Sequence, residues 1–473
     1  MSIVRSLVVN TAARSLTELI TRLGAAAFWV IVARSLGAAA LGSLAFGLAL
    51  YSFFTTISTL GLGSVVVRDV ARERSRAGVY YSHTLLVTVV FSLLTAAIMI
   101  GVTLLLKPNP DTTFAALVLA AAIVPASAFM VGRSLLFAAE DMAKVTLARL
   151  GESAFKVLAG LLLLHWGAGV RGIAAALAIS KMLPLFIVQP FVSRVAKPVW
   201  RLDAPLLRYL VRMIPSFSTI SIFNSLFWSA PVVMLTRVSG EYQAGLFAAA
   251  FKLVDITLSF SNAYGQALFP IAARTLKHNF DLFKSMFVKS IKYIFIMSAA
   301  LAAALSVMAD QIILFLYGAK MAEAAPILQI IAWMIVPFAV VPILSSTLVS
   351  SDLQKRDLLA NVSASAVAVI TVRLAAPTAG ALSAAAAYVS ACLIFALIEW
   401  ASVRRKMFHF SVSAHLWKPI VGVLLMSLLL TWGKELFLPI NLAVAGVAYL
   451  MFLLLSKSIT KNEWLLVKQL KTV

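Results

Sequence analysis

Cysteine, acidic side chains and long polar segments are all scarce in this chain. The one cysteine, Cys392, lies in an apolar stretch, which excludes a disulfide framework and a metal site built from thiols. Asp and Glu number 18 against 40 Lys and Arg, and charged residues make up 12% of the chain, about half of the ~25% typical of soluble domains. No polar segment is long enough to fold by itself, which excludes a large catalytic loop and a nucleotide-binding domain.

Motifs for cofactor chemistry are missing as well. The sequence has no GxxxxGK[ST] phosphate loop, no GxGxxG opening a helix, no HExxH and no paired-cysteine spacing. The five histidines are scattered near the ends of apolar stretches, where each is more readily an interfacial residue than a ligand. The N-terminal apolar stretch is too long and too charged for a cleavable signal peptide. We therefore expect no catalytic residue, no metal and no cofactor.

Apolar residues dominate what is present. They make up 62% of the 473 residues, and the mean hydropathy is +0.98. These values predict an all-α integral membrane protein of about fourteen transmembrane helices. The expected spans centre near residues 23, 50, 93, 125, 157, 182, 224, 257, 302, 338, 366, 390, 425 and 446.

The basic residues fix the expected orientation. The net charge of +22 comes from short clusters between apolar spans, a pattern typical of cytoplasmic membrane loops rather than of nucleic-acid binding. Of the 40 Lys and Arg, seven lie in or at the rim of a span and six fall in alternate loops, which leaves 27 for the opposite side. We predict a multi-pass protein of the inner or plasma membrane with both termini in the cytoplasm and no nucleic-acid partner.

Short motifs recur at offsets of 203 to 211 residues. Arg34-x-x-Gly37-x4-Gly42 returns as Arg237-x-x-Gly240-x4-Gly245, Asp141-x-x-Lys144 as Asp352-x-x-Lys355, and Gly172 before an alanine run as Gly380. Reuse of Gly and Arg in short connections is the alternative explanation. A duplicated six-helix unit predicts two pseudo-symmetric lobes, 1–200 and 201–408, followed by two additional helices and a tail over 409–473.

Charges within the first span suggest a cavity. Arg14, Glu18 and Arg22 share one helix face, and each charge inside hydrocarbon costs roughly 2.5–3.5 kcal/mol. A face of that kind is expected to line a bundle interior or a water-filled cavity. The alternatives are an interfacial position for Arg14 and a structural ion pair between Glu18 and Arg22.

Further charged residues lie deep in later spans. Lys252 is a candidate phosphate or sugar ligand and Asp255 a candidate coupling site for a proton or cation, with a static interhelical pair as the alternative. Lys181 has no carboxylate within one turn of its own helix, which favours a cavity role. Arg133 is a candidate for the cytoplasmic side of the fourth span.

Other polar residues of the spans are open to structural explanations. Arg149, Glu152 and Lys156 share one face, and Glu152 and Lys156 have the spacing of a favourable pair, so these three are expected mainly to stabilise the bundle. Arg373 and Glu399 lie near span ends and are expected to be interfacial. A polar stripe in the seventh span includes Asn224 and Trp228, which suit sugar recognition, although hydrogen bonding between helices explains it equally well. The full stripe is Ser218, Ser221, Asn224, Ser225 and Trp228.

Four stretches carry a family resemblance. ARSLGAAALGSLAFG (33–47), LGLGSVVVRDVARER (60–74), SGEYQAGLFAAAFKLVD (239–255) and LVSSDLQKRDLLAN (348–361) resemble the polysaccharide-transporter branch, the O-antigen-type flippases, of the multidrug/oligosaccharidyl-lipid/polysaccharide exporter superfamily. The resemblance implies a two-lobed bundle with a central cationic cavity. It also implies alternating access that moves a polyprenyl-pyrophosphate-linked oligosaccharide to the outer leaflet, among membrane lipids. A glycan polymerase or another export component is a further candidate partner.

Physical chemistry supports an anionic substrate independently. An unpaired diphosphate could not cross a low-dielectric region, whereas a cavity lined with Arg and Lys supplies charge-assisted hydrogen bonds. Basic residues outnumber acidic ones in the spans, seven to four, which disfavours an exporter of organic cations. An ion-coupled multidrug or small-molecule exporter of the same fold remains the alternative. A membrane-embedded glycan polymerase is disfavoured because the chain lacks a long outer loop.

Overall fold

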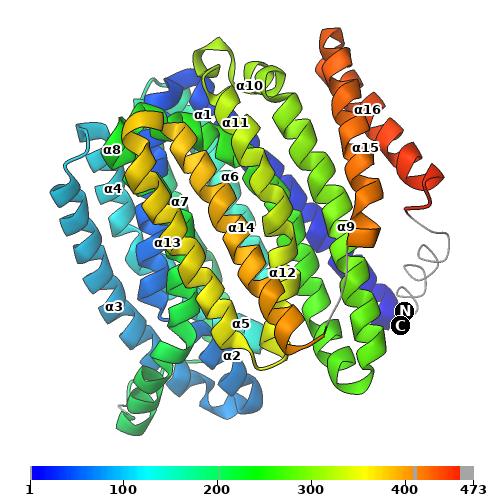
Figure 1. Cartoon of the computed structure of the whole chain (residues 1–473). Coiled ribbons are helices and arrows are strands. Elements are labelled where there is room, and N and C mark those ends of the chain that lie inside the picture. Colours follow the sequence, from blue (N-terminus) through cyan, green and yellow to red (C-terminus); the bar gives the residue numbers. More distant parts are fainter. Residues whose placement is uncertain (1–2, 202, 409–412, 459–473) are drawn as a thin grey trace. The chain divides into compact units, whose positions relative to one another are not determined.

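The computed structural model describes residues 3–201, 203–408 and 413–458. Within these ranges it does not describe the side chains of residues 3–23, 216–217, 266–267, 270–271, 273–274, 277 and 413–415. Every regular element in the described ranges is a helix (Figure 1). The protein consists of two compact units, Met1–Ala249 and Ala250–Val473, each of which makes most of its contacts internally. The repeat-based boundaries at residues 200 and 408 stay a prediction.

The helices of the first unit carry its cavities. They are α1 (Ile3–Thr59), α2 (Leu62–Arg72), α3 (Ala77–Leu106), α4 (Pro110–Ala121), α5 (Ile123–Ala138), α6 (Met142–His165), α7 (Gly169–Val195) and the first part of α8 (Ala204–His278). The remainder of α8 belongs to the second unit. The other helices of that unit are α9 (Phe280–Val307), α10 (Ala309–Tyr317), α11 (Ala324–Ile331), α12 (Ile335–Ser350), α13 (Gln354–Ala379), α14 (Ala381–Lys406), α15 (Ser413–Trp432) and α16 (Leu438–Leu455).

The predicted all-α membrane fold is confirmed. In the described part of the chain, eleven helical segments are long and apolar enough to cross a membrane, and all fourteen predicted span centres lie within helices. The segment Ser218–Gly265 of α8 contains two predicted centres, and the segment Gly24–Thr59 of α1 begins just after the centre near residue 23 and contains the one near residue 50. The centre near residue 157 lies in α6, which is not among the eleven and carries Lys144, Arg149, Glu152 and Lys156.

Two glycines of the repeated motif bend the chain in the same way. Gly37 within α1 has φ 82° and ψ −178°, and Gly240 within α8 has φ 83° and ψ 172°. Residues with a Cβ rarely adopt a φ in this range, which explains why glycine stands at both positions. The matching conformations, 203 residues apart, support the internal repeat read from the sequence.

The next pair of repeated glycines brings the two junctions into direct backbone contact. A Cβ built on Gly42 would lie 1.9 Å from the Glu241 carbonyl oxygen, and one built on Gly245 would lie 1.7 Å from the Ala38 carbonyl oxygen. Residues 38 and 241, like 42 and 245, are related by the same offset, so each junction packs against the equivalent part of the other. The Glu241 carboxylate adds hydrogen bonds from the Asn109 backbone N–H (3.1 Å) and the Thr112 hydroxyl (3.2 Å).

An apolar core holds α2 against its neighbours. Val65 and Val66 of α2 and Leu135 of α5 have no exposed surface and belong to one buried cluster with Val188 and Val192 of α7. Burying side chains of this size contributes roughly 1.5–3 kcal/mol each. The first turn of α2 is thereby fixed beside α5.

Close packing of small residues joins α13 to α14 in the second unit. Ala364, Ala368, Ala384 and Ala385 are completely buried, so the two backbones approach closely. The additional helices α15 and α16 lie side by side (Figure 1), and α15 also contacts α9. The Tyr449 hydroxyl of α16 donates to the Ile296 carbonyl oxygen of α9 at 3.1 Å.

Candidate functional site

Three cavities in the first unit adjoin one another, and together we call them the groove. The serine cavity (410 Å³) includes Asn224 and Trp228, the lysine cavity (310 Å³) includes Lys181, and the arginine cavity (520 Å³) includes Arg133. The serine and lysine cavities share Ser52, Thr56 and Ser221. The lysine and arginine cavities share Thr59, Gly61 and Met130. The groove is therefore built by α1, α2, α3, α5, α6, α7 and α8.

An ion pair lies in the lysine cavity. Lys181 Nζ of α7 contacts Glu152 Oε1 of α6 at 2.6 Å, and the two side chains are 28% and 13% exposed. The ammonium also lies 6.0 Å from the ring centre of Tyr51, and Arg149 lines the same cavity. The sequence placed Glu152 with Lys156 of its own helix. In the structure the Glu152 carboxylate forms an ion pair with Lys181 of the neighbouring helix α7.

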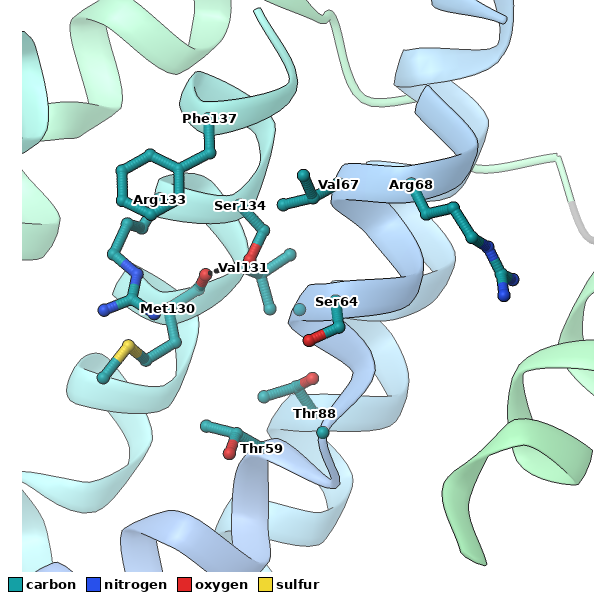
Figure 2. Close-up of a pocket in the computed structure, with 12 residues that line it drawn as sticks. Thr59, Ser64, Val67, Arg68, Thr88, Met130, Val131, Arg133, Ser134 and Phe137 are labelled. Atoms are coloured by element: carbon teal, nitrogen blue, oxygen red, sulfur yellow. Dashed lines mark hydrogen bonds between the residues drawn. The ribbon is translucent and has the colours of Figure 1, made fainter. Parts of the chain in front are cut away.

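The arginine cavity contains a second basic side chain. Arg133 of α5 stacks over Phe137, with its guanidinium carbon 5.3 Å from the ring centre, and both residues line the cavity (Figure 2). Its Nε is buried and has no hydrogen-bond partner among the described residues. A further basic residue, Arg149, lines the adjoining lysine cavity. This end of the groove is therefore strongly cationic.

Arg68 also lines the arginine cavity, but its guanidinium is already engaged. Arg68 Nε lies 2.7 Å from Asp69 Oδ1, and Nη2 lies 2.5 Å from the Tyr209 hydroxyl. Burial raises the pKa of Asp69, but hydrogen bonds from Arg68, Tyr209 and Tyr80 outweigh it and hold that pKa below its usual range. Figure 2 shows the Arg68 side chain directed away from Arg133. Arg68 fixes α2 to the start of α8 rather than presenting a charge to the cavity.

The serine cavity is lined by uncharged polar groups. Ser221, Asn224, Ser225 and Trp228 follow one another along α8, and Ser52 and Thr56 of α1 complete the lining. Hydroxyl and amide groups beside an indole ring can bind sugars through hydrogen bonds and stacking. The Ser225 hydroxyl is also within 3.5 Å of the Ser52 carbonyl oxygen, so part of the stripe joins α8 to α1.

The sequence and the structure agree in part on candidate residues. Arg133, Lys181, Asn224 and Trp228 all line the groove. The proposed first-span face of Arg14, Glu18 and Arg22 lies outside the described side chains. Lys252 and Asp255 belong to the second unit, where Lys252 is half-buried and Asp255 is exposed.

Arg149, which the sequence analysis expects mainly to stabilise the bundle, lines the lysine cavity. One expectation needs correction. Glu399 was expected to be interfacial, but it is completely buried, with Oε1 2.6 Å from the Ser345 hydroxyl. The same hydroxyl lies 2.7 Å from Asp357 Oδ1. One hydroxyl hydrogen can serve only one carboxylate, so a proton on one of the two carboxyls completes the arrangement.

Residues missed by the sequence analysis lie around the arginine cavity. Gly61, Gly63, Ser64 and Thr88 line this cavity. The first three belong to the stretch 60–74 that carries the family resemblance, and Thr88 is an isolated threonine within an apolar span. The sequence feature that could have indicated this cavity is the pair Gly61 and Gly63 at the start of a helix, followed by the charged residues Arg68 and Asp69. In the described part of the chain, no group of three or more His, Cys, Asp or Glu could hold a metal ion.

Comparisons with known proteins agree with this fold. Residues 7–276 match the family model described as polysaccharide biosynthesis protein. The structure is similar to the lipid II flippase MurJ in an inward closed conformation, with a TM-score of 0.79 and 13% identity over 93% of this chain and 97% of that one. No curated protein matches the chain in sequence.

Two transporters described as members of the MOP superfamily are also similar in fold. An inward-facing multidrug resistance MATE family transporter of the MOP superfamily has a TM-score of 0.68 and 16% identity over 82% of this chain and 94% of that one. A MOP superfamily transporter from Pyrococcus furiosus, described as having a binding pocket of reverse polarity, has a TM-score of 0.52 and 15% identity over 82% and 95%. Since the family model covers more than half of the chain, the protein belongs to the polysaccharide biosynthesis protein family and is a multi-pass membrane protein with a MOP-type transporter fold.

Proposed function

We propose that the protein is a flippase that moves a polyprenyl-(pyro)phosphate-linked oligosaccharide from the cytoplasmic to the outer leaflet. The observation that carries the proposal is the polarity of the groove. Three of its lining residues present a basic group (Arg133, Arg149 and Lys181) and one, Glu152, an acidic group, while the charge of Arg68 is paired with Asp69. A transporter for organic cations needs the opposite balance of charge.

The groove offers a separate environment for each part of such a substrate. Arg149, Arg133 and Lys181 can donate charge-assisted hydrogen bonds to phosphate oxygens, which offsets the desolvation of the anion. Asn224 and Trp228 in the adjoining serine cavity suit the sugars. The lysine cavity, which holds Arg149 and Lys181, shares residues with the arginine cavity and with the serine cavity.

The Lys181–Glu152 pair gives the empty groove a way to limit its positive charge. Without substrate, Glu152 neutralises Lys181 at 2.6 Å. A phosphate that enters the lysine cavity competes with Glu152 for the ammonium, and Glu152 takes it back when the substrate leaves. Such an exchange permits binding without trapping the anion.

The proposal includes parts that extend beyond the groove. The protein lies in the inner or plasma membrane with both termini in the cytoplasm. Transport is coupled to an ion gradient or to the membrane potential, with Asp255 as the candidate coupling group. Arg14, Glu18, Arg22 and Lys252 are further candidate cavity residues. A glycan polymerase is a candidate partner.

The test measures lipid-linked glycan that accumulates on the inner leaflet of cells that depend on this protein. Arg149→Gln removes one charge-assisted contact and is expected to lower the export rate about 10-fold or more. Arg171→Gln is the matched control, because Arg171 forms an exposed pair with Asp111 at 2.8 Å away from the groove. Normal export by Arg149→Gln at normal protein level, or drug efflux without glycan export, would overturn the proposal.

A further inference from the structure

The first turn of α2 lies at the edge of the arginine cavity. α1 ends at Thr59 and α2 begins at Leu62, and the chain reverses through Leu60 (φ 53°) and Gly61 (φ 67°). Gly61 is the N-cap residue, and no side chain caps this helix end. The Ser64 N–H donates to the Gly61 carbonyl oxygen at 3.2 Å, and the N–H groups of Leu62 and Gly63 precede the first acceptor of the helix. This end of α2 carries a partial positive charge and favours an anion.

The backbone of this turn is accessible from the cavity. Gly61, Gly63 and Ser64 all line it. A Cβ built on Gly63 would lie 2.7 Å from the Ser134 hydroxyl of α5, so glycine is required for the two helices to approach this closely. The Ser134 hydroxyl donates to the Met130 carbonyl oxygen at 2.9 Å and is not free to move away without losing that bond.

A buried hydroxyl without a partner borders the same cavity. Thr88 of α3 is 1% exposed, and its Oγ1 makes no hydrogen bond among the described residues. Serine and threonine hydroxyls in helices usually donate to a carbonyl one turn earlier, as Thr103 of α3 does at 2.8 Å to the Met99 carbonyl oxygen. A buried unpaired hydroxyl is unfavourable, and because Thr88 lines the cavity, a ligand bound there can supply the missing partner.

The charge in the cavity is not balanced by the described residues. Arg133 has a buried Nε without a partner among the described residues, whereas the guanidinium of Arg68 is held by Asp69 and Tyr209. In Figure 2, Thr88 and Ser64 lie on one side of the cavity, while Met130 and Arg133 come from α5 on the other. The helix end, the hydroxyl and the guanidinium therefore border one space.

We infer that the arginine cavity is a binding site for a phosphate or diphosphate group, held by the Gly63 N–H in the first turn of α2, the Thr88 hydroxyl and the Arg133 guanidinium. The inference rests on the proposed function for the source of the anion, a prenyl-linked diphosphate. Because the stretch 60–76 is assigned to the cytoplasmic side, this site would receive the head group from the cytoplasmic leaflet before the lysine cavity does. Free pyrophosphate has the same binding chemistry and is separated from the lipid by the test.

The test is isothermal titration of the purified full-length protein in detergent with farnesyl diphosphate, inorganic pyrophosphate and farnesol. Thr88→Val keeps the shape of the side chain and removes the hydroxyl, so we expect affinity for both diphosphates to fall about 10-fold, the loss of one hydrogen bond to a charged group. Arg133→Gln is expected to cause a larger loss. Farnesol should not bind. Tighter binding of farnesyl diphosphate than of pyrophosphate identifies the lipid as the source.

Thr84→Val is a matched control on the same helix. Thr84 is also completely buried with an unpartnered hydroxyl, one turn before Thr88, but it does not line the cavity. Both valine variants should be as stable as the parent or more so, and only Thr88→Val should weaken binding. A second measurement keeps every proposed ligand in place. Ser64 is exposed, so the thiol of Ser64→Cys can be alkylated by a thiol reagent, and bound farnesyl diphosphate should protect it from that reagent.

The outcomes separate the two proposals. Parental affinity in both Thr88→Val and Arg133→Gln, or equal weakening by Thr84→Val and Thr88→Val, would overturn the phosphate site even if glycan export is intact. Diphosphate binding that depends on Thr88 and Arg133 in a protein that exports no glycan would support the site and count against the flippase.

Discussion

Replacing Glu152 by glutamine removes the negative charge that holds Lys181 while keeping the size of the side chain. Exposed ion pairs contribute about 0–1 kcal/mol, and removing one partner of a buried pair costs about 3–5 kcal/mol. Lys181 and Glu152 are 28% and 13% exposed, between those extremes, so we assign their interaction about 2 kcal/mol. At 1.4 kcal/mol for each factor of ten, this corresponds to roughly 30-fold in an equilibrium constant.

If phosphate competes with Glu152 for Lys181, then Glu152→Gln should tighten binding of farnesyl diphosphate by up to about 30-fold and slow glycan export because release becomes difficult. Isothermal titration measures the first effect, and the rate of glycan export measures the second. Lys181→Gln should weaken binding instead, since it leaves Glu152 unpaired beside the anion. Asp111→Asn is the control, because it breaks the exposed Arg171–Asp111 pair and should change neither quantity.

Unchanged or weaker binding by Glu152→Gln, with the protein folded, would refute the reasoning. It would show that the Lys181–Glu152 pair only joins α6 to α7.

Two further predictions concern stability, measured by thermal unfolding of the purified protein. Gly42→Ala should destabilise the first unit by about 1–3 kcal/mol, because its Cβ would lie 1.9 Å from a backbone oxygen that cannot rotate away. Gly101→Ala in α3 is the control: its Cβ would have no atom within 4 Å, so the change should be neutral or stabilising. Equal effects of the two changes would contradict the close contact. Glu399→Gln should change stability by no more than about 0.5 kcal/mol, since a neutral amide replaces a carboxyl that shares one proton with Asp357 through Ser345. Glu399→Ala should cost about 2 kcal/mol, because it removes the partner of Ser345. A glutamine variant as unstable as the alanine variant would show that both carboxyls are charged.

The sequence by itself determined the all-helical membrane fold. In a bilayer every backbone polar group must be satisfied within its own segment, so long apolar stretches can only be helices, and all fourteen centres lie in them. Gly37 and Gly240 could be paired from the sequence because a positive φ leaves little choice but glycine. The charged and polar residues Arg133, Lys181, Asn224 and Trp228 could be selected because such residues are unfavourable in hydrocarbon.

Only the tertiary structure decided which of these residues meet. Glu152 lies 29 positions from Lys181, and nothing in the spacing along either helix distinguishes that partner from Lys156. Glu399 looked interfacial from its place near a span end, but packing of α12, α13 and α14 enclosed it with Ser345. The groove itself depends on how α1, α5 and α8 pack, because periodicity tells which face of a helix is polar and only packing tells which other face it meets.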